Sequence, residues 1–491
     1  MVQGLSQRFL RGLARSPDRV AVRVGDTALS YRDLHERALR RAGAVAAAGA
    51  RRVGVLADKG PAAYTGLLAA LHAGATVVPL RPDFPAARTA AMIEAAQIDL
   101  LLTDEASLPA ARATGVPIAG DDAPALPEPR PVTADDTAYI LFTSGSTGRP
   151  KGVPISQGNA AHYFGLIDKR YDFTAQDVFS QTFDLNFDCA LFDVFCAWGA
   201  GAGLVAVPGH AYRELPAFLA EHRITVWFAT PSAIPLVARM GGLGAGALPG
   251  LRWSFFAGEA LRCDDAQRWQ VAAPASTLEN LYGPTELTIT IGAHRWGPAS
   301  AARSVNGVVP IGLPHPGHDH LLLGPDGTPT DDDEGELCVT GPQATAGYLD
   351  PADNVGRFLR HDGRTWYRTG DRVRRLDDDL LYLGRADAQV QIRGVRVELA
   401  EIDHAVRGCA QVQEAVTVAT AAEGELELVV FYTGVPTSAG VLARQLRAVL
   451  PAGLVPRHYR HVAELPLNTN RKIDRTALRG VAAELVAAGA G

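Results

Sequence analysis

The sequence predicts an α/β protein that also contains a small antiparallel sheet or barrel and ends in a compact mixed α and β segment. Short apolar runs alternate with alanine-rich helical stretches over residues 20–130, and again over about 157–253. This rhythm is typical of βαβ units around a mostly parallel sheet. Residues 305–373 change to short strands separated by turns, and the mixed segment follows Gly384.

The two parallel regions are expected from clear local signals. In the first region the sequence predicts a strand at residues 53–57, a helix at 62–73 and a strand at 76–80. A proline-rich connection, 124–131, precedes a further strand at 138–142. The alternation then resumes, with strands expected near 203–207 and 226–229.

The later regions have shorter predicted strands and more turn signals. Turn signals such as Pro325-Asp326-Gly327 and Asp362-Gly363 separate short strands, which favours an antiparallel arrangement. The last segment is expected to contain helices at 399–407 and 439–449 and strands at 413–420 and 426–431. This mixture predicts a small, separate α+β unit.

Composition excludes several classes of protein. The 491 residues carry a net charge of −6 and offer no basic stripe interleaved with aromatics, so no nucleic-acid partner is expected. No apolar run reaches the ~18 residues that span a membrane. Residues 1–19 predict a basic amphipathic helix without the apolar core of a secretory signal. The five scattered cysteines suggest a cytoplasmic protein with neither disulfides nor a zinc site.

Lysine is rare in this chain. The four lysines are Lys59, Lys151, Lys169 and Lys472, and every other basic position except histidine is arginine. We attribute this bias to the base composition of the source. A lysine that persists where arginine is the default is therefore worth examining as a functional residue.

A candidate phosphate-binding loop follows the strand expected at 138–142. Residues 143–152 read Thr-Ser-Gly-Ser-Thr-Gly-Arg-Pro-Lys-Gly, so hydroxyls, glycines and a lysine could surround phosphate oxygens. The spacing is not a Walker A loop, because Pro150 precedes Lys151 and Gly152 follows it. An ordinary Ser/Gly-rich surface loop is the alternative, and the rarity of lysine weighs against it.

The loop resembles the phosphate loop of the adenylate-forming superfamily, which contains peptide-synthetase adenylation domains, acyl-CoA ligases and luciferases. Six further segments resemble core motifs of this family and fall in the family's order, so the resemblance covers essentially the whole chain. They are residues 29–34, 73–80, 280–286, 367–371, 384–399 and 470–475. Within the family, the chain is similar to stand-alone adenylation enzymes of nonribosomal peptide synthesis and to D-alanine–carrier protein ligases.

The resemblance implies two domains. Residues 1–384 would form a large N-terminal core of two doubly wound sheets plus a small antiparallel β-barrel. Residues 385–491 would form a small mobile α+β C-terminal domain, which rotates about a hinge at Asp387 between an adenylating and a thioester-forming orientation. This domain would carry the catalytic Lys472, which bridges the substrate carboxylate and the α-phosphate; a solvated surface lysine is the alternative.

The resemblance also implies ATP and Mg²⁺ as cofactors. Glu286 would bind Mg²⁺ with help from Thr143, although outside its motif Glu286 would be interpreted as a helix-start glutamate. Asp371 would accept the ribose hydroxyls, or else be a turn aspartate. Tyr282 and Tyr382 would pack on adenine, or else be core tyrosines. The implied ATP-binding residues are Thr143, Ser144, Gly145, Ser146, Thr147, Gly148, Lys151, Gly258, Glu259, Ala260, Asn280, Tyr282, Gly283, Thr285, Asp371, Tyr382, Arg385 and Lys472.

Two residues depart from the family pattern. Arg471 stands where the family usually has glycine, so its side chain must point away from the nucleotide or add a phosphate contact. Gln391 stands where lysine is more common, and this departure puts the thioester-forming step or carrier docking in doubt.

Asp188 distinguishes an amino-acid substrate from a fatty acid. An amino acid carries an α-ammonium, and burying this cation without a counter-charge is costly. Asp188 resembles the aspartate that binds the ammonium in amino-acid adenylation domains. Phe183-Asp184 offers a competing frame, but Phe192 and Phe195 fit the aromatic spacing that follows Asp188. A helix N-cap aspartate is the alternative for both positions.

By resemblance, the substrate pocket contains no charged side chain apart from Asp188. Two phenylalanines make it shallow, so we expect a small neutral amino acid: alanine of either hand, proline, serine or a short aliphatic one. The pocket residues would be Asp188, Cys189, Phe192, Ala229, Phe255, Ala257, Leu281, Ile289 and Thr290.

The resemblance predicts a ligase that forms aminoacyl-AMP and passes the acyl group to a separate phosphopantetheinyl carrier protein. Too few residues follow Lys472 for a carrier module, which is why a separate partner is expected. The alternatives are an acyl- or aryl-CoA ligase of the same superfamily and an inactive nucleotide-binding or carrier-docking protein. No membrane partner is expected.

Overall fold

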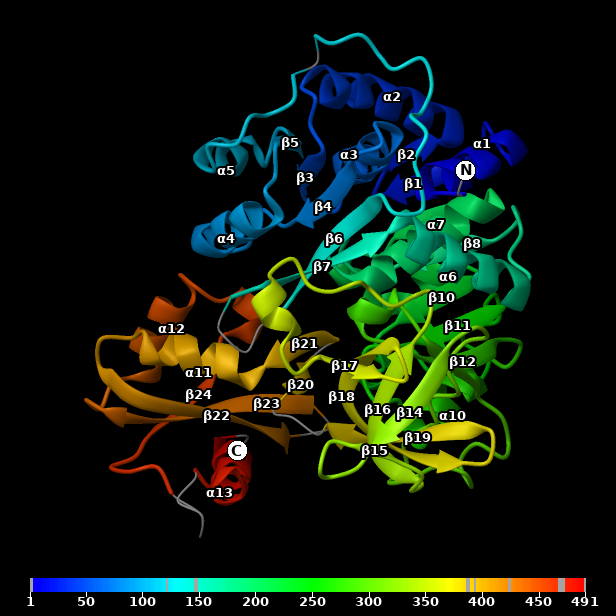
Figure 1. Ribbon diagram of the computed structural model, residues 1–491. Coiled ribbons are helices and arrows are strands. Elements are labelled where there is room, and N and C mark those ends of the chain that lie inside the picture. Colours follow the sequence, from blue (N-terminus) through cyan, green and yellow to red (C-terminus); the bar gives the residue numbers. More distant parts are fainter. Residues whose placement is uncertain are drawn as a thin grey trace. The chain divides into compact units, whose positions relative to one another are not determined.

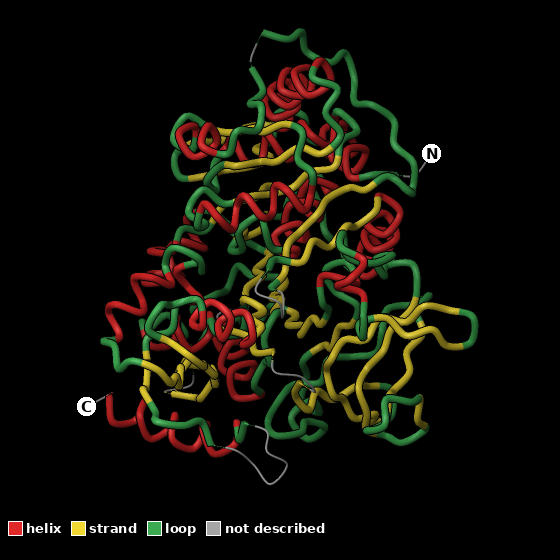
Figure 2. Tube along the Cα trace, turned by 60° about the vertical axis from the view of Figure 1, so that its left-hand side comes forward, coloured by secondary structure: helices red, strands yellow, loops and turns green. Residues whose placement is uncertain are grey.

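The computed structural model describes residues 3–120, 122–144, 149–385, 389–392, 394–422, 425–466 and 473–489. The chain divides into two compact units (Figures 1 and 2). The larger unit comprises Met1–Pro82, Ile93–Phe142 and Gly152–Ala386, and the smaller unit comprises Asp83–Met92, Thr143–Lys151 and Asp387–Gly491.

A five-stranded sheet has the order β5-β3-β4-β6-β7. Its strands are β3 (Arg52–Leu56), β4 (Thr76–Leu80), β5 (Leu100–Thr103), β6 (Thr137–Thr143) and β7 (Lys151–Ser156). Strand β3 runs parallel to β4 and β5, and β4 runs parallel to β6. The strands are almost continuously apolar and buried, as expected for a parallel sheet covered on both faces.

The N-terminal part of the chain also contains helices. They are α1 (Leu5–Arg15), α2 (Tyr31–Ala47), α3 (Pro61–His72), α4 (Ala86–Ala96) and α5 (Leu108–Ala113). Helix α3 packs on β3, β4 and β5 and beside α2 (Figure 1). It begins with a proline, whose missing N–H costs nothing in the first turn. Helix α2 begins with a capping box, in which Ser30 and Asp33 each bond the other's backbone N–H.

An eight-stranded sheet has the order β13-β12-β11-β10-β8-β9-β1-β2. Its strands are β1 (Val20–Val24), β2 (Thr27–Ser30), β8 (Val178–Gln181), β9 (Gly203–Ala206), β10 (Val226–Ala229), β11 (Trp253–Phe256), β12 (Thr277–Tyr282) and β13 (Gly292–Arg295). The inner pairs are parallel, whereas β13 and β2 close the two edges in the antiparallel direction. Its helices are α6 (Gln157–Arg170), α7 (Asp188–Ala200), α8 (Leu215–Glu221), α9 (Ala233–Arg239) and α10 (Cys263–Ala272), with a 3₁₀ turn η1 (Gly209–Glu214).

A curled antiparallel sheet completes the larger unit. Strands β15-β14-β16-β18-β17 follow one another, and β19 pairs with β18. The strands are β14 (Asp319–Leu323), β15 (Pro329–Thr330), β16 (Glu334–Thr340), β17 (Phe358–His361), β18 (Arg364–Leu376) and β19 (Asp379–Arg385). The 3₁₀ turn η3 (Pro351–Asn354) lies between β16 and β17, and the 3₁₀ turn η2 (Thr285–Leu287) lies between β12 and β13 of the eight-stranded sheet.

The smaller unit has its own apolar core. Strands β20 (Gln389–Ile392) and β21 (Val395–Glu398) form a hairpin, and β22 (Val412–Ala422), β23 (Glu425–Gly434) and β24 (His458–His461) form a sheet. Helices α11 (Leu399–Arg407), α12 (Ala439–Leu446) and α13 (Arg475–Gly489), with the turn η4 (Ala452–Leu454), complete it. The cluster around Val397, Ile402 and Val430 is fully buried.

The predicted α/β class, with two mostly parallel sheets, a curled antiparallel sheet and an α+β segment, is confirmed. The first two strands belong to the eight-stranded sheet. Strands β1 and β2 do not join β3, because β1 pairs with β9 in the eight-stranded sheet. All five cysteines are buried and free. Among the described residues, the helices are too short or too polar to cross a membrane.

Candidate active site

Asp188 lies at the first position of α7, directly after the N-cap Phe187. Its carboxylate accepts hydrogen bonds from the Thr285 hydroxyl and the Cys189 backbone N–H. Burial is the main cause that raises the pKa of Asp188 to about 6, and the nearby Glu286 charge adds to this shift. The position therefore favours a ligand that brings a positive charge to the carboxylate.

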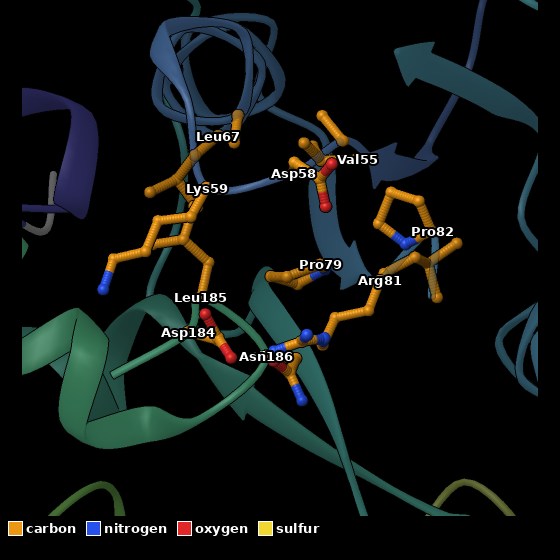
Figure 3. A pocket seen from close by; sticks show the side chains of 13 residues that line it. Val55, Asp58, Lys59, Leu67, Pro79, Arg81, Pro82, Asp184, Leu185 and Asn186 are labelled. Carbon is orange, nitrogen blue, oxygen red and sulfur yellow. Dashed lines mark hydrogen bonds and ion pairs between the residues drawn. The ribbon is translucent and has the colours of Figure 1, made fainter. Parts of the chain in front are cut away.

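Asp184, the competing candidate, has a different environment. It forms an ion pair with Arg81 and lines a cavity of about 330 Å³ (Figure 3). The cavity lies at the carboxyl ends of β3 and β4, and Lys59 and Asn186 also line it. Because Asp184 already has a cationic partner within the fold, its carboxylate has less need of a ligand cation than that of Asp188.

The apolar residues expected in the substrate pocket are largely brought together. One buried cluster contains Cys189, Phe192, Phe255, Ala257, Leu281 and Ile289. The rings of Phe192 and Phe255 meet edge to face with centroids 5.4 Å apart. Thr290 is buried beside them, and its hydroxyl shares a 2.8 Å hydrogen bond with that of Tyr163.

Ala229 is the exception. Its side chain packs in a second cluster with Trp227 and Phe256, on the face of the sheet opposite to Phe255. Side chains alternate along a strand, so the preceding residue, Phe228, faces the pocket cluster instead. Its ring centroid lies 5.1 Å from that of Phe192. Phe228, rather than Ala229, therefore packs in the cluster that holds the other apolar candidates.

The turn after η2 has an unusual backbone. Thr288 and Ile289 have φ values of 58° and 70°, a left-handed conformation that β-branched residues seldom adopt. Gly283 makes room for it, because a Cβ at this glycine would lie 2.6 Å from the Thr290 Cα and 2.8 Å from the Ile289 carbonyl oxygen. Strain of this kind persists only where surrounding contacts impose it.

Glu286 is 1% exposed and lies in the 3₁₀ turn η2. The Tyr348 hydroxyl donates to its Oε1 at 2.5 Å, and the Thr345 N–H donates to its backbone carbonyl at 2.8 Å. Its carboxylate lies close enough to Asp188 to raise the pKa of Asp188. A second buried carboxylate in this position fits a divalent cation, which would offset the repulsion between the two charges.

The candidate nucleotide residues of the larger unit gather around Asp371 on β18. The Tyr282 hydroxyl donates to Asp371 Oδ2 at 2.6 Å, and Arg385 Nη1 donates to Oδ1 at 2.8 Å. Burial, with the Asp371 charge beside it, raises the pKa of Tyr282. The backbone N–H of Asp371 is held by the Thr369 hydroxyl at 3.0 Å. These contacts orient the Asp371 carboxylate near the middle of β18.

Other candidate nucleotide residues follow β11 or lie within β12 and β19. Gly258 follows β11 with a φ of 90°, and the Glu259 carboxylate accepts from the Ser232 N–H at 2.9 Å. Ala260 is exposed. The Asn280 amide donates to the carbonyl of Pro310 at 2.8 Å, which makes it a structural anchor within the fold. Tyr382 packs partly buried against the core of the curled sheet.

The smaller unit holds the remaining candidates. The Ser144 hydroxyl donates to the Arg396 carbonyl at 2.8 Å and accepts from the Glu398 N–H at 3.2 Å. Thr143 ends β6, and Lys151, at the start of β7, is 7% exposed. Gly145, Ser146, Thr147, Gly148, Asp387, Arg471 and Lys472 lie outside the described residues.

Residues 9–349 match the family model described as AMP-binding enzyme. The chain belongs to this family. AMP-binding enzymes of the adenylate-forming superfamily activate a substrate at the expense of ATP, typically with Mg²⁺, and the present chain is an adenylate-forming ligase of this kind.

Solved structures of family members cover nearly the whole chain. It is 55% identical to IdnL7, with a TM-score of 0.76 and 99% of both chains covered. It is 29% identical to the Vibrio cholerae adenylation domain AlmE in complex with glycyl-adenosine-5'-phosphate, with a TM-score of 0.87 and 97% of both chains covered. It is 26% identical to PA1221, a peptide-synthetase protein with adenylation and carrier (PCP) domains, with a TM-score of 0.82, covering 97% of this chain and 84% of that one.

The curated relatives of this AMP-binding enzyme include Enterobactin synthase component F of Shigella flexneri, at 34% identity, and a dimodular nonribosomal peptide synthase of Bacillus subtilis, at 32% identity, each matched over 96% of this chain. The chain spans about two fifths of the first relatives' length, 39% and 42% for two of them.

Sequence reasoning missed three residues of the site. Phe228 packs in the pocket cluster, Tyr348 holds the Glu286 carboxylate, and Gln343 contacts the turn at Thr288. The alternation of side chains along β10 could have pointed to Phe228. Tyr348 and Gln343 lie more than fifty residues after the turn that they contact, and no local pattern signals such a pairing.

Proposed function

We propose that this chain activates a small neutral amino acid with ATP to give aminoacyl-AMP and pyrophosphate, and then transfers the aminoacyl group to the phosphopantetheine thiol of a separate carrier protein. The Asp188 carboxylate carries the proposal. It lies at the edge of an apolar cluster, burial raises its pKa to about 6, and the described groups that donate hydrogen bonds to it, from Thr285 and Cys189, are neutral. An α-ammonium would supply a positive counter-charge.

The pocket cluster supports a small side chain. Phe192, Phe228 and Phe255 have edge-to-face ring contacts and little exposed surface, so they leave limited room. Cys189, Ala257, Leu281 and Ile289 join these rings in the apolar core, so a charged substrate side chain among them would be buried against apolar groups. The glycyl-adenylate bound to the related Vibrio cholerae domain is in keeping with this choice of substrate.

The nucleotide would be bound by the segments that resemble the family motifs. Asp371 would accept the ribose hydroxyls, and Glu286 would hold Mg²⁺, whose charge would neutralise the phosphates of ATP. Lys151 and Lys472 would supply further positive charge to the phosphates and the substrate carboxylate, because two anions must meet in the adenylation step. The carrier partner is supported by the related PA1221, which joins an adenylation domain to a carrier domain.

The decisive experiment is ATP–pyrophosphate exchange measured across the proteinogenic amino acids plus D-alanine. We expect stimulation by alanine, proline, serine or short aliphatic amino acids and none by charged ones. Adding a phosphopantetheinylated carrier protein in trans then tests the thioester step by mass spectrometry. No stimulation by any amino acid would disprove the proposal.

An Asp188→Ala variant tests the role of the counter-charge. Removing the partner of a buried cation costs about 3–5 kcal/mol, so kcat/KM for the amino acid should fall at least a hundredfold. Asp184→Ala is the matched control and should retain exchange, because Asp184 is paired with Arg81. Full activity of Asp188→Ala would instead favour an acyl- or aryl-CoA ligase, which has no ammonium to bind.

A further inference from the structure

The geometry points to Gln343 as a positioning residue that sets the shape of the substrate pocket by holding the turn of residues 287–290. This inference rests on the proposed function, because the pocket in question is the one proposed for the amino-acid side chain. Gln343 has no counterpart among the family motifs described above, and it does not belong to the pocket itself.

The side-chain amide of Gln343 bonds three carbonyls of one turn. Its Nε2 donates to the Leu287 oxygen at 3.0 Å and to the Thr290 oxygen at 2.9 Å, with a longer contact of 3.4 Å to the Thr288 oxygen. The Thr288 hydroxyl donates back to the Gln343 carbonyl at 2.6 Å. The turn and residue 343 are therefore tied together through both side chains.

The turn needs this support because its backbone is strained. Thr288 and Ile289 both have positive φ, which their β-branched side chains resist. Strained conformations of this kind persist only where other contacts over-determine them. Without the amide bonds the turn is expected to relax, and the pocket side chains of Ile289 and Thr290 would move with it.

The burial of Gln343 indicates that the hydrogen bonds donated by its side-chain amide help to hold the turn. The residue is 0% exposed, and its amide oxygen has no hydrogen-bond partner among the described residues. If the Gln343 side-chain amide were flipped, its oxygen would face the carbonyl oxygens of the turn and repel them. The turn carbonyls therefore fix the orientation of this amide. An apolar side chain would avoid the unpaired acceptor, yet glutamine is present and its two N–H groups are used.

Residues that follow Gln343 in the chain also contact Glu286, which lies two residues before Thr288. Tyr348 donates to that carboxylate and Thr345 holds the Glu286 backbone. The Gln343 amide bonds carbonyls of residues 287–290, which follow Glu286 and include the pocket residues Ile289 and Thr290. Its loss should therefore affect the amino acid much more than ATP.

The test is Gln343→Met, which keeps the length and approximate volume of the side chain but removes both donors. We expect the KM for alanine to rise about tenfold and discrimination between alanine and the larger leucine to fall by a similar factor, while the KM for ATP changes less than about threefold. Gln270→Met is the matched control, since Gln270 Nε2 also donates to two carbonyls, those of Ala273 and Ser276, near the end of α10. It should leave both KM values unchanged.

Thr288→Val provides a second variant that removes the reciprocal hydrogen bond. It should raise the KM for alanine in the same direction, and the double variant should be less than additive, because both substitutions release the same turn. Should Gln343→Met fail to fold, Thr288→Val decides the question with the same assays. Variants that lower the melting temperature but leave the alanine KM and the alanine-to-leucine discrimination unchanged would show a purely structural role and overturn the inference.

The two proposals fail in different ways. If the wild-type chain shows no exchange with any amino acid, the proposed function is wrong. If wild-type exchange with a small amino acid is present and Gln343→Met leaves its amino-acid kinetics unchanged, only the positioning role is wrong.

Discussion

At the residue scale, two neighbouring aspartates show how environment assigns a role. Asp184 and Asp188 are four positions apart and both follow a phenylalanine. Arg81 forms an ion pair with the first, whereas the described donors to the second are neutral: the Thr285 hydroxyl and the backbone N–H and thiol of Cys189. Neutral donors compensate burial only in part, so the pKa of Asp188 remains raised. The difference lies in the surroundings and is absent from the local sequence.

The raised pKa of Asp188 predicts a pH dependence of amino-acid binding. Only the ionised carboxylate pairs with an ammonium, so protonation below pH of about 6 should weaken binding about tenfold per pH unit. Above pH 6, the dissociation constant for alanine in the absence of nucleotide should be nearly constant up to pH 8. Calorimetry between pH 5 and 8 measures this, and binding near pH 6 should release protons to the buffer.

Two variants isolate the source of this pH effect. Asp188→Asn should abolish the inflection along with most of the affinity, while Asp184→Asn should keep it. A dissociation constant independent of pH between 5 and 7 in the wild type would contradict the assignment of Asp188 as the ammonium partner.

The sequence identified most candidate residues through motifs, but it could not assign their contacts. Asn280 illustrates this, because its amide is used within the fold to bond the Pro310 carbonyl. Lys59 was noted only for the rarity of lysine. In the structure its ammonium donates to the Gln181 carbonyl at 2.6 Å, and burial lowers its pKa to about 7. Such contacts depend on tertiary packing, which local patterns do not encode.

At the element scale, several candidate functional residues lie in the turn between β12 and β13. It carries Glu286, Ile289 and Thr290 within five residues. The Ile291 N–H closes it by donating to the Tyr282 carbonyl at 2.6 Å. Gly283 allows the two arms of the turn to approach one another, so the turn depends on the absence of a side chain there.

Gly283→Ala should therefore impair both stability and activity. The added Cβ would meet backbone atoms at 2.6–2.8 Å, which cannot move aside as a flexible side chain would. Overpacking of this kind costs about 1–3 kcal/mol, and displacement of Glu286 and Ile289 should lower kcat/KM at least tenfold. Urea denaturation and pyrophosphate exchange measure the two effects.

Gly250→Ala is the control for this prediction. Gly250 lies before β11, its φ is not left-handed, and an added Cβ would approach nothing closer than 3.7 Å. It should leave stability and activity nearly unchanged. A Gly283→Ala variant with wild-type stability and kinetics would show that the turn adapts more easily than its packing indicates.

Local elements were largely predictable, whereas their pairing was not. The expected strands at 76–80 and 226–229 and the helix at 399–407 coincide with β4, β10 and α11. Their periodicity and their turn residues are encoded locally. The pairing of β1 with β9 joins residues about 180 positions apart, and no period in either segment specifies such a partner. The left-handed Thr288 and Ile289 also contradict local propensity, as is common where surrounding contacts impose a conformation.

At the scale of the whole molecule, the larger unit buries several histidines in neutral form. His72 is 0% exposed, and its ring nitrogens bond the Ser6 hydroxyl at 2.8 Å and the His35 ring at 3.0 Å. Burial lowers its pKa to about 3. His315 is 5% exposed, and burial lowers its pKa to about 4. Each must stay neutral in the fold but takes up a proton in the unfolded chain near pH 6.5.

This arrangement predicts that the larger unit loses stability in acid. The contribution of each histidine is fully present above pH 6.5 and is lost as the pH falls toward its lower folded-state pKa, because the unfolded chain then binds more protons. At pH 5, each of His72 and His315 should cost on the order of 2 kcal/mol. All six tryptophans lie within residues 198–366 of the larger unit, so tryptophan fluorescence in urea reports its unfolding at each pH.

His72→Gln makes this prediction specific. Glutamine retains polar atoms for the Ser6 contact but cannot titrate, so the slope of unfolding free energy against pH between 4.5 and 6 should decrease by about 1.4 kcal/mol per pH unit, the value for one proton. His210→Gln is the control, because His210 is exposed in the same unit and should leave the slope unchanged. Equal slopes for wild type and His72→Gln would mean that His72 is protonated inside the fold, and acid sensitivity would then have to arise from other groups.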